Sequence, residues 1–203
     1  MTIRLHRGDL PDDAVFGDSV AIDTETLGLN PLRDRLCVVQ LSRGDGTADV
    51  VQIDRKAHAP NLARLMGDRN VLKIFHFARF DLAVLYHALG VMPGPVYCTK
   101  IASKLSRTYT DRHGLKDNLR ELLGVDISKQ QQSSDWAATE LSEAQLAYAA
   151  SDVLYLHALK AKLDGMLARE ERTELAQACF DFLPTRALLD LSGWPETDIF
   201  AHM

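Results

Sequence analysis

Four acidic residues in three short contexts constrain the fold of this chain more than any other feature. Asp23 and Glu25 lie in the sequence DTE, Asp81 ends HFARFD, and Asp152 ends YAASD. Each context closes an apolar stretch that is typical of a protein core. Carboxylates are rarely buried unless they are paired or bind metal. Four of them gathered at one point would require cations, and carboxylates that hold two divalent ions are typical of phosphoryl-transfer sites.

The composition predicts one globular domain without a membrane segment. The chain has 203 residues, of which 46% are hydrophobic, and this suits a single domain with a large core. No stretch reaches the apolar length of a membrane span, and residues 1–13 lack an apolar signal core. The cysteines, Cys37, Cys98 and Cys179, are widely spaced and odd in number. We therefore expect reduced structural thiols in a cytoplasmic protein.

The net charge of −5 restricts the kind of nucleic acid that the chain could bind. Long duplexes are usually held by a basic face that releases counterions, and the sequence has no run of lysine and arginine of that kind. A nucleic-acid partner should therefore be short or single-stranded and contacted at few phosphates. Bound metal would also cancel part of the negative charge.

The hydrophobic pattern predicts a strand-rich first half. β-branched or apolar runs favour strands at residues 19–23, 36–42, 48–53 and 71–75. The turn sequence at 43–46 predicts that the second and third of these runs form a hairpin.

The second half is predicted to be helical. Helical spacing covers residues 80–89, 99–105 and 115–123, and a capping box formed by Ser142 and Gln145 opens one long helix. A last helical region covers 170–191, where we expect Pro184 to interrupt it. The result is an α/β fold with a mixed central sheet flanked by helices. No linker is visible, so we expect a single domain over residues 1–203, with a core at about 19–160 and a helical C-terminal extension at about 165–203.

The first two acidic contexts have plausible structural explanations when each is taken alone. Residues i and i+2 of a strand point to the same face, so Asp23 and Glu25 would project together and share Mg²⁺ or Mn²⁺. Two unrelated acids at a solvated strand end are the alternative. Asp81 lies in the first turn of a predicted helix, where an anion also complements the helix dipole.

Tyr148 and Asp152 form the pair that favours a functional interpretation. At positions i and i+4 of one helix they share a face, so a phenol and a carboxylate would meet at one point. A hydrogen bond between the two on the helix surface is the alternative. All three contexts together, in this order along the chain, favour a metal site.

Five segments of the chain resemble the motifs of one nuclease family. They are DTET with the following LGL, HFARFD, GLKDNLRELLGVDI, QSSDW and LSEAQLAYAASDVLYL. Together they look like the three exonuclease motifs of the DEDD superfamily, tyrosine (DEDDy) branch, and they are most similar to ribonuclease D, over residues 19–159. The chain also resembles the short, single-domain relatives of ribonuclease D called nano-RNase C (NrnC), which act on very short RNA. The resemblance implies a ribonuclease-H-like core and 3′→5′ exonucleolysis that releases nucleoside 5′-monophosphates.

The resemblance also implies roles for individual residues. Asp23, Glu25, Asp81 and Asp152 would be ligands of two divalent cations, Mg²⁺ or Mn²⁺, and Tyr148 would position or deprotonate the attacking water. An unperturbed phenol has a pKa of about 10 and is a poor general base. We therefore expect Tyr148 to orient the water rather than to abstract its proton.

Six further residues are candidate substrate contacts: Thr24, Leu27, Gly28, His76, Gln132 and Trp136. Leu27 and Gly28 directly follow the first acid pair and could hold the terminal base, with core packing an equal alternative for Leu27. His76 is either a ligand or phosphate contact, or a histidine hydrogen-bonded at a strand end, and the pattern favours the last. Trp136 is as readily a core anchor.

The chain departs from the family pattern in two places. The family often has asparagine at the position of His76 and arginine near Ser133. Neither change removes a ligand, but each could alter how a phosphate or the terminal nucleotide is held. We expect the neighbouring Phe77 and Phe80 to be core residues rather than base-stacking platforms. Full-length ribonuclease D also carries helical nucleic-acid-binding domains for which this sequence has no room.

Three hypotheses follow for the function. The first is an exoribonuclease for short single-stranded RNA, dinucleotides included. The second is the same chemistry on tRNA 3′ trailers or single-stranded DNA. The third, a non-catalytic nucleic-acid-binding module, is disfavoured because all four acids and the tyrosine are present. The resemblance to nano-RNase C also suggests a ring-like homo-oligomer. A candidate interface is the C-terminal apolar set, with core packing as the alternative: Phe180, Phe182, Leu188, Leu189, Leu191, Trp194 and Phe200.

Overall fold

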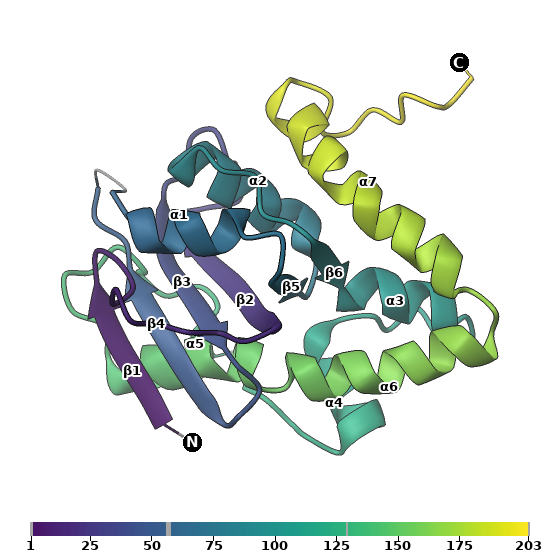
Figure 1. Cartoon of the computed structure of the whole chain (residues 1–203), viewed down its shortest axis with the longest axis horizontal. Coiled ribbons are helices and arrows are strands. Elements are labelled where there is room, and N and C mark those ends of the chain that lie inside the picture. The colour runs from purple at the N-terminus through teal and green to yellow at the C-terminus, as the bar shows by residue number, and fades with distance from the viewer. Residues whose placement is uncertain (1, 56–57, 129, 203) are drawn as a thin grey trace.

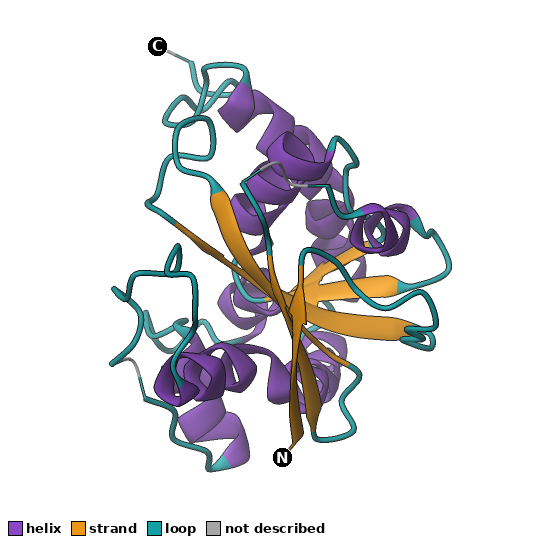
Figure 2. Ribbon diagram, turned by 90° about the vertical axis from the view of Figure 1, so that its left-hand side faces the viewer, coloured by secondary structure: helices purple, strands orange, loops and turns teal. Residues whose placement is uncertain are grey.

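The computed structural model describes residues 2–55, 58–128 and 130–202. Within these residues, six strands form one mixed sheet in the order β1-β4-β3-β2-β5-β6 (Figure 1). The strands are β1 (Thr2–Arg7), β2 (Ser19–Thr26), β3 (Leu36–Ser42), β4 (Thr47–Gln52), β5 (Leu72–Phe75) and β6 (Val96–Cys98). Helices lie on both sides of this sheet (Figure 2). The predicted mixed sheet flanked by helices is therefore confirmed.

Strand β2 lies inside the sheet and joins its antiparallel and parallel parts. It pairs antiparallel with β3 and parallel with β5. The predicted hairpin is present, because β3 and β4 pair antiparallel across residues 43–46. In the β2–β3 register Asp23 faces Gln40 and Glu25 faces Val38, and the register shifts between Glu25 and Thr26. This pairing fixes which side chains share a face with the first two acids.

The sequence pattern missed two strands and one helix. Strand β1 is the polar, mostly exposed edge strand TIRLHR, which pairs parallel with β4. Strand β6 has three residues, too few to show a period. Helix α1 (Pro60–Gly67) begins with a proline and covers two turns. Short or polar elements of this kind owe their structure to their partners rather than to their own hydrophobic pattern.

The other helices cluster in the second half of the chain, as predicted. They are α2 (Ala78–Leu89), α3 (Thr99–Ser106), α4 (Leu115–Leu123), α5 (Glu143–Leu154), α6 (Leu156–Arg169) and α7 (Thr173–Leu191). Helix α5 packs on β1, β2, β3 and β4, whereas α2 contacts β2, β3, β5 and β6. The sheet is thus covered by different helices on its two faces.

The prediction of one long helix after Ser142 is wrong. The capping box of Ser142 and Gln145 is present, but the helix breaks at Tyr155, which has φ −104° and ψ −2° and separates α5 from α6. The apolar stripe continues through the break, so the pattern does not reveal it. Its physical reason is a change of partner: α5 packs on the sheet, and α6 packs on α3, α4 and α7.

The predicted interruption at Pro184 is also wrong, because α7 runs through it. A proline inside a helix removes one backbone hydrogen bond and crowds the preceding turn. Phe180, Leu183 and Ala187 flank Pro184 and are all buried in the main core. Tertiary packing on both sides of the proline therefore holds the helix together.

Two predictions from composition can be compared with the structure. Cys37 and Cys98 are buried, Cys179 is half-buried, and all three are free thiols. In the described part of the chain, no helix combines the length and the apolar character needed to cross a membrane.

Candidate active site

The first two acids project from the inner part of the sheet toward helix α5. Side chains alternate along β2, so Asp23 and Glu25 share one face and Thr24 points to the other. On the same face as Asp23, the buried Gln40 of β3 donates a hydrogen bond from Nε2 to Asp23 Oδ2 at 2.7 Å. This bond fixes the orientation of the Asp23 carboxylate.

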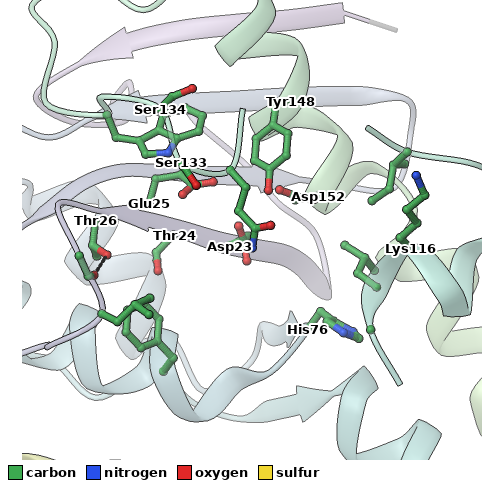
Figure 3. Close-up of a pocket in the computed structure, with 18 of the residues that line it drawn as sticks. Asp23, Thr24, Glu25, Thr26, His76, Lys116, Ser133, Ser134, Tyr148 and Asp152 are labelled. Carbon is green, nitrogen blue, oxygen red and sulfur yellow. Dashed lines mark hydrogen bonds between the residues drawn. The ribbon is translucent and has the colours of Figure 1, made fainter. Parts of the chain in front are cut away.

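Helix α5 brings Tyr148 and Asp152 over this face of the sheet. Carboxylate oxygens of Asp23, Glu25 and Asp152 all lie within 4.8 Å of one another. Figure 3 shows these three side chains and Tyr148 pointing into one pocket from two different elements. The strand period and the helix period thus place residues more than 120 positions apart in a single cluster.

Asp81 lies beside the three clustered acids and comes from helix α2. It is buried in the first turn of α2, and its Oδ1 accepts a hydrogen bond from Thr24 Oγ1 at 2.7 Å. Thr24 was a candidate substrate contact, and the structure turns its hydroxyl to Asp81. Asp81 is not part of the three-carboxylate group, but its charge raises the pKa of Asp23. All four predicted acids therefore lie in one electrostatic environment.

Asp23, Glu25 and Asp81 hold their protons more tightly than free carboxylates do. Burial is the largest cause, and it raises the pKa of Asp23 well above its ordinary range, with repulsion from Asp81 next. Burial, followed by repulsion from Asp152, raises the pKa of Glu25 to about 9. Burial raises the pKa of Asp81 to about 7, against the opposing hydrogen bond from Thr24.

Asp23, Glu25 and Asp81 are not neutralised by a cationic side chain within the described part of the chain. None of the ion pairs between described residues involves Asp23, Glu25 or Asp81. Clustered carboxylate oxygens with raised pKa values are a donor set for hard divalent cations, which would replace the protons and relieve the repulsion. The site therefore fits the metal that its sequence predicts.

Tyr148 is held as a neutral phenol above the acids. Burial, followed by the charges of Asp152 and Glu25, raises its pKa far above its ordinary value. Its ring packs on the indole of Trp136 with the ring centroids 5.9 Å apart. Trp136 itself is 2% exposed, as the core-anchor alternative requires, but it also lines the pocket.

The pocket around the acids has a volume of about 660 Å³ and contains every predicted substrate contact. Leu27 is 55% exposed there rather than packed in the core. Gly28 has a steric reason to be glycine, because a Cβ at this position would lie 2.3 Å from Asp34 Oδ2. Gln132 is exposed, and His76 Nδ1 lies 2.8 Å from Thr99 Oγ1, the hydrogen-bonded arrangement that the pattern favoured.

The structure also reveals residues that the sequence reasoning missed. Gln40 could have been found from the sequence, because it is the one polar side chain inside the apolar run LCVVQL, which is buried throughout. Lys100 and Lys116 line the pocket as well, without a local pattern that marks them. The expectation that Phe77 belongs to the core is wrong, because it is 45% exposed.

Comparison with known proteins identifies the family. Residues 12–168 match the 3′–5′ exonuclease family. The chain belongs to this family. Ribonuclease D of Gluconacetobacter diazotrophicus is 37% identical to this chain over 158 residues, which cover 76% of the chain and 39% of the relative. The chain thus spans about two fifths of the length of these curated relatives.

Solved structures extend the match over the whole exonuclease. NrnC of Brucella melitensis with bound Mg²⁺ is 68% identical, covers 100% of both chains and has a TM-score of 0.96. The same protein bound to pGG is 69% identical, again with full coverage and a TM-score of 0.96. RNase D of Escherichia coli, 24% identical with a TM-score of 0.78 over 92% of this chain and 51% of its own, shares the fold. The resemblance to ribonuclease D and NrnC that the motifs predicted is confirmed.

Proposed function

We propose that the chain is a 3′→5′ exoribonuclease that hydrolyses short oligoribonucleotides, dinucleotides included, to nucleoside 5′-monophosphates. The observation that carries this proposal is the group of three carboxylates within 4.8 Å of one another, with Asp81 beside it, in an open pocket. The family supplies the reaction class, 3′–5′ exonucleolysis, and implies dependence on a divalent cation. The roles of individual residues and the substrate are our proposals.

Asp23, Glu25, Asp81 and Asp152 are proposed to hold two divalent cations, Mg²⁺ or Mn²⁺. Such ions, when bound, neutralise charge on the attacked phosphate and increase the acidity of water. The protein's own contribution is orientation: Gln40 fixes Asp23 and Thr24 fixes Asp81. Magnesium in the related NrnC structure supports this assignment.

Tyr148 is proposed to orient the attacking water. Its raised pKa keeps the phenol protonated, so the Oη–H acts as a hydrogen-bond donor or acceptor rather than as a general base. The packing of Tyr148 on Trp136 fixes the ring, and this preorganisation is what a positioning group requires. Gln132, Leu27, Gly28 and His76 are proposed to contact the terminal nucleotide.

Short RNA is the proposed substrate for two reasons. NrnC bound to pGG is 69% identical over its full length, which supports a substrate of that size for this chain. The net charge of −5 also disfavours strong binding of a long polyanion. We also propose a single exonuclease domain over residues 1–203, a ring-like homo-oligomer and a cytoplasmic location. Exposed Leu188, Trp194 and Phe200 support an interface, whereas Phe180 is buried in the chain's own core.

The substrate proposal is tested with labelled RNA of two to about twenty nucleotides in the presence of Mg²⁺ or Mn²⁺. We expect the rate to fall as the length increases and the product to be a nucleoside 5′-monophosphate. A strong preference for long or structured RNA would favour tRNA 3′-end processing instead, and equal rates on single-stranded DNA would favour a general exonuclease.

The site assignment is tested separately with Asp23→Ala and Asp152→Ala. We expect each to remove activity, because each deletes a proposed ligand of the cluster. Asp13→Asn, at an exposed acid that does not line the acidic pocket, is the matched control and should retain activity. Full activity of either alanine variant would overturn the assignment of that acid, whereas an unaltered protein without activity on any of these substrates would favour the non-catalytic binding module.

A further inference from the structure

A buried hydrogen-bond network joins helix α3 to helix α4. Its centre is Arg107, which directly follows α3 and is 0% exposed. Nη1 of its guanidinium donates hydrogen bonds to Ser103 Oγ at 3.0 Å, to the backbone oxygen of Arg112 at 2.8 Å and to Asn118 Oδ1 at 3.0 Å. Nη2 donates to the carboxylate of Glu121 in α4. One arginine thus connects α3, the loop after it and α4.

The network continues from Arg107 to the residues that begin α4. Asn118 is 0% exposed, and its Nδ2 donates a hydrogen bond to the backbone oxygen of Gly114 at 2.9 Å. Ser103 is also 0% exposed, and its Oγ lies 2.9 Å from Nδ1 of His113. His113 and Gly114 are therefore each held by a buried side chain that also binds Arg107.

The residues held in this way lead directly into one wall of the acidic pocket. Gly114, Leu115 and Lys116 line that pocket, and Figure 3 shows Lys116 at its side. Lys100 and Lys116 are the lysines among the described residues that line it. Because RNA is a polyanion, the position of this wall should affect how tightly the substrate binds. The wall contains none of the four acids, so it can affect RNA binding without moving the proposed metal ligands.

Stability alone is a weak explanation for a network of this kind. Removing a guanidinium from water costs several kcal/mol, and a buried ion pair seldom stabilises a fold more than well-packed apolar residues would. A fixed guanidinium does provide geometry, because its planar fork holds several acceptors at set angles. The acceptors of Arg107 among the described residues lie between positions 103 and 121, so the geometry that it fixes is local.

We infer that Arg107, Ser103 and Asn118 are positioning residues for RNA binding. None of the three is among the described residues that line the acidic pocket. They act through residues 113 and 114, whose placement sets where Lys116 presents its ammonium group to the substrate. This inference rests on the proposed function and adds to it a set of residues that control the affinity for RNA without touching it.

The first test breaks the link between Asn118 and the wall while keeping a partner for Arg107. Asn118→Asp has nearly the same shape and retains Oδ1 as an acceptor, but it loses the Nδ2–H donor to Gly114. We expect KM for a dinucleotide to rise about two- to tenfold, the effect of one hydrogen bond, with kcat and the Kd for Mg²⁺ unchanged. Gln130→Glu adds the same charge at an exposed position that does not line the pocket, and this control should keep KM unchanged.

The second test determines whether the effect passes through Lys116. We expect Lys116→Ala to raise KM for the same dinucleotide at least about tenfold, because a charge-assisted contact is lost. Asn118→Asp should then add nothing further in the Lys116→Ala protein, since residues that act through one another are not additive. A merely structural role of Asn118 would instead give independent, additive effects.

Four results would overturn the inference: an unchanged KM in Asn118→Asp, a fall in kcat or in Mg²⁺ affinity with KM kept, an equal rise of KM in Gln130→Glu, or additivity with Lys116→Ala. If Asn118→Asp does not fold, Ser103→Ala, which removes the hydroxyl that binds His113, decides the question by the same measurements. If the unaltered protein hydrolyses no RNA, the proposed function fails and this inference with it, whereas an unchanged KM in an active variant overturns this inference alone.

Discussion

Replacing Glu25 with glutamine should stabilise the metal-free protein and weaken its stabilisation by Mg²⁺. The substitution keeps the size of the side chain but removes one of the crowded carboxylates. In the absence of metal, Glu25 has a pKa of about 9, against 4.5 for an ordinary glutamate, because of burial and the charges of Asp152 and Asp81. The folded protein thus retains a proton that the unfolded chain releases.

The sign and the size of the effect follow from this difference. Because the folded-state pKa lies above the unfolded value, the stabilising contribution is fully present below pH 4.5 and is lost as the pH rises toward about 9. At pH 7 the loss is about 3 kcal/mol, and screening by solvent at the partly exposed carboxyl reduces it to about 2 kcal/mol. Glutamine avoids this loss, so the melting temperature should rise by about 4–8 °C.

The assay is thermal unfolding of both proteins in EDTA and in MgCl₂ at several pH values. In EDTA, the melting temperature of the variant minus that of the unaltered protein should be near zero at about pH 4.5 and should grow as the pH rises. This subtraction cancels the contributions of the other titrating groups. In MgCl₂ at a hundredfold excess over Kd, the unaltered protein should gain about 2.7 kcal/mol and the variant much less. Glu140→Gln, at an exposed loop position, is the control. A variant that is less stable than the unaltered protein in EDTA at pH 8 would refute the reasoning.

Three further predictions concern two residues of the site and one buried arginine outside it. Tyr148→Phe should lower kcat about tenfold to a hundredfold while the shape of the pH–rate profile is kept, because the phenol does not titrate in the working range; loss of the limb on which the rate rises with pH would instead identify a general base. Gln40→Leu should weaken Mg²⁺ binding about tenfold by calorimetry, since Asp23 loses its orienting donor, and an unchanged Kd would count against this role. Arg107→Met should lower the free energy of unfolding in urea by about 3 kcal/mol, because the buried guanidinium binds Ser103 and Asn118. A decrease of less than about 1 kcal/mol would contradict this prediction.

The parts of the site that sequence could predict are those set by local periodicity. Asp23 and Glu25 share a face because of the strand period, and Tyr148 and Asp152 because of the helix period. The hydrogen bonds from Gln40 and Thr24 could not be predicted in the same way. They depend on the register of β2 against β3 and on the packing of α2, which bring together residues 17 and 57 positions apart.

The errors in the fold have the same origin. The apolar stripe that continues past Tyr155 does not show that the helices on its two sides pack on different partners. Likewise, the presence of Pro184 does not show how well the neighbouring residues are buried. Phe77 is predicted to be a core residue because its side chain is aromatic. In the structure it is exposed and has a left-handed φ, which no pattern of side chains encodes. In each case a tertiary contact or a backbone angle overrides the local preference.

The break at Tyr155 separates the residues of the acidic site from two helices that support it. The chain before it, through α5, supplies all four acids and the tyrosine, while α6 and α7 after it pack mainly on other helices. Figure 1 shows α7 standing away from β1 to β4 at the end of this second part. The two helices after residue 155 therefore support the site from outside, because α7 packs on α2, which carries Asp81, and α6 packs on α3 and α4. A change in α7 would thus reach the acids through Asp81 first.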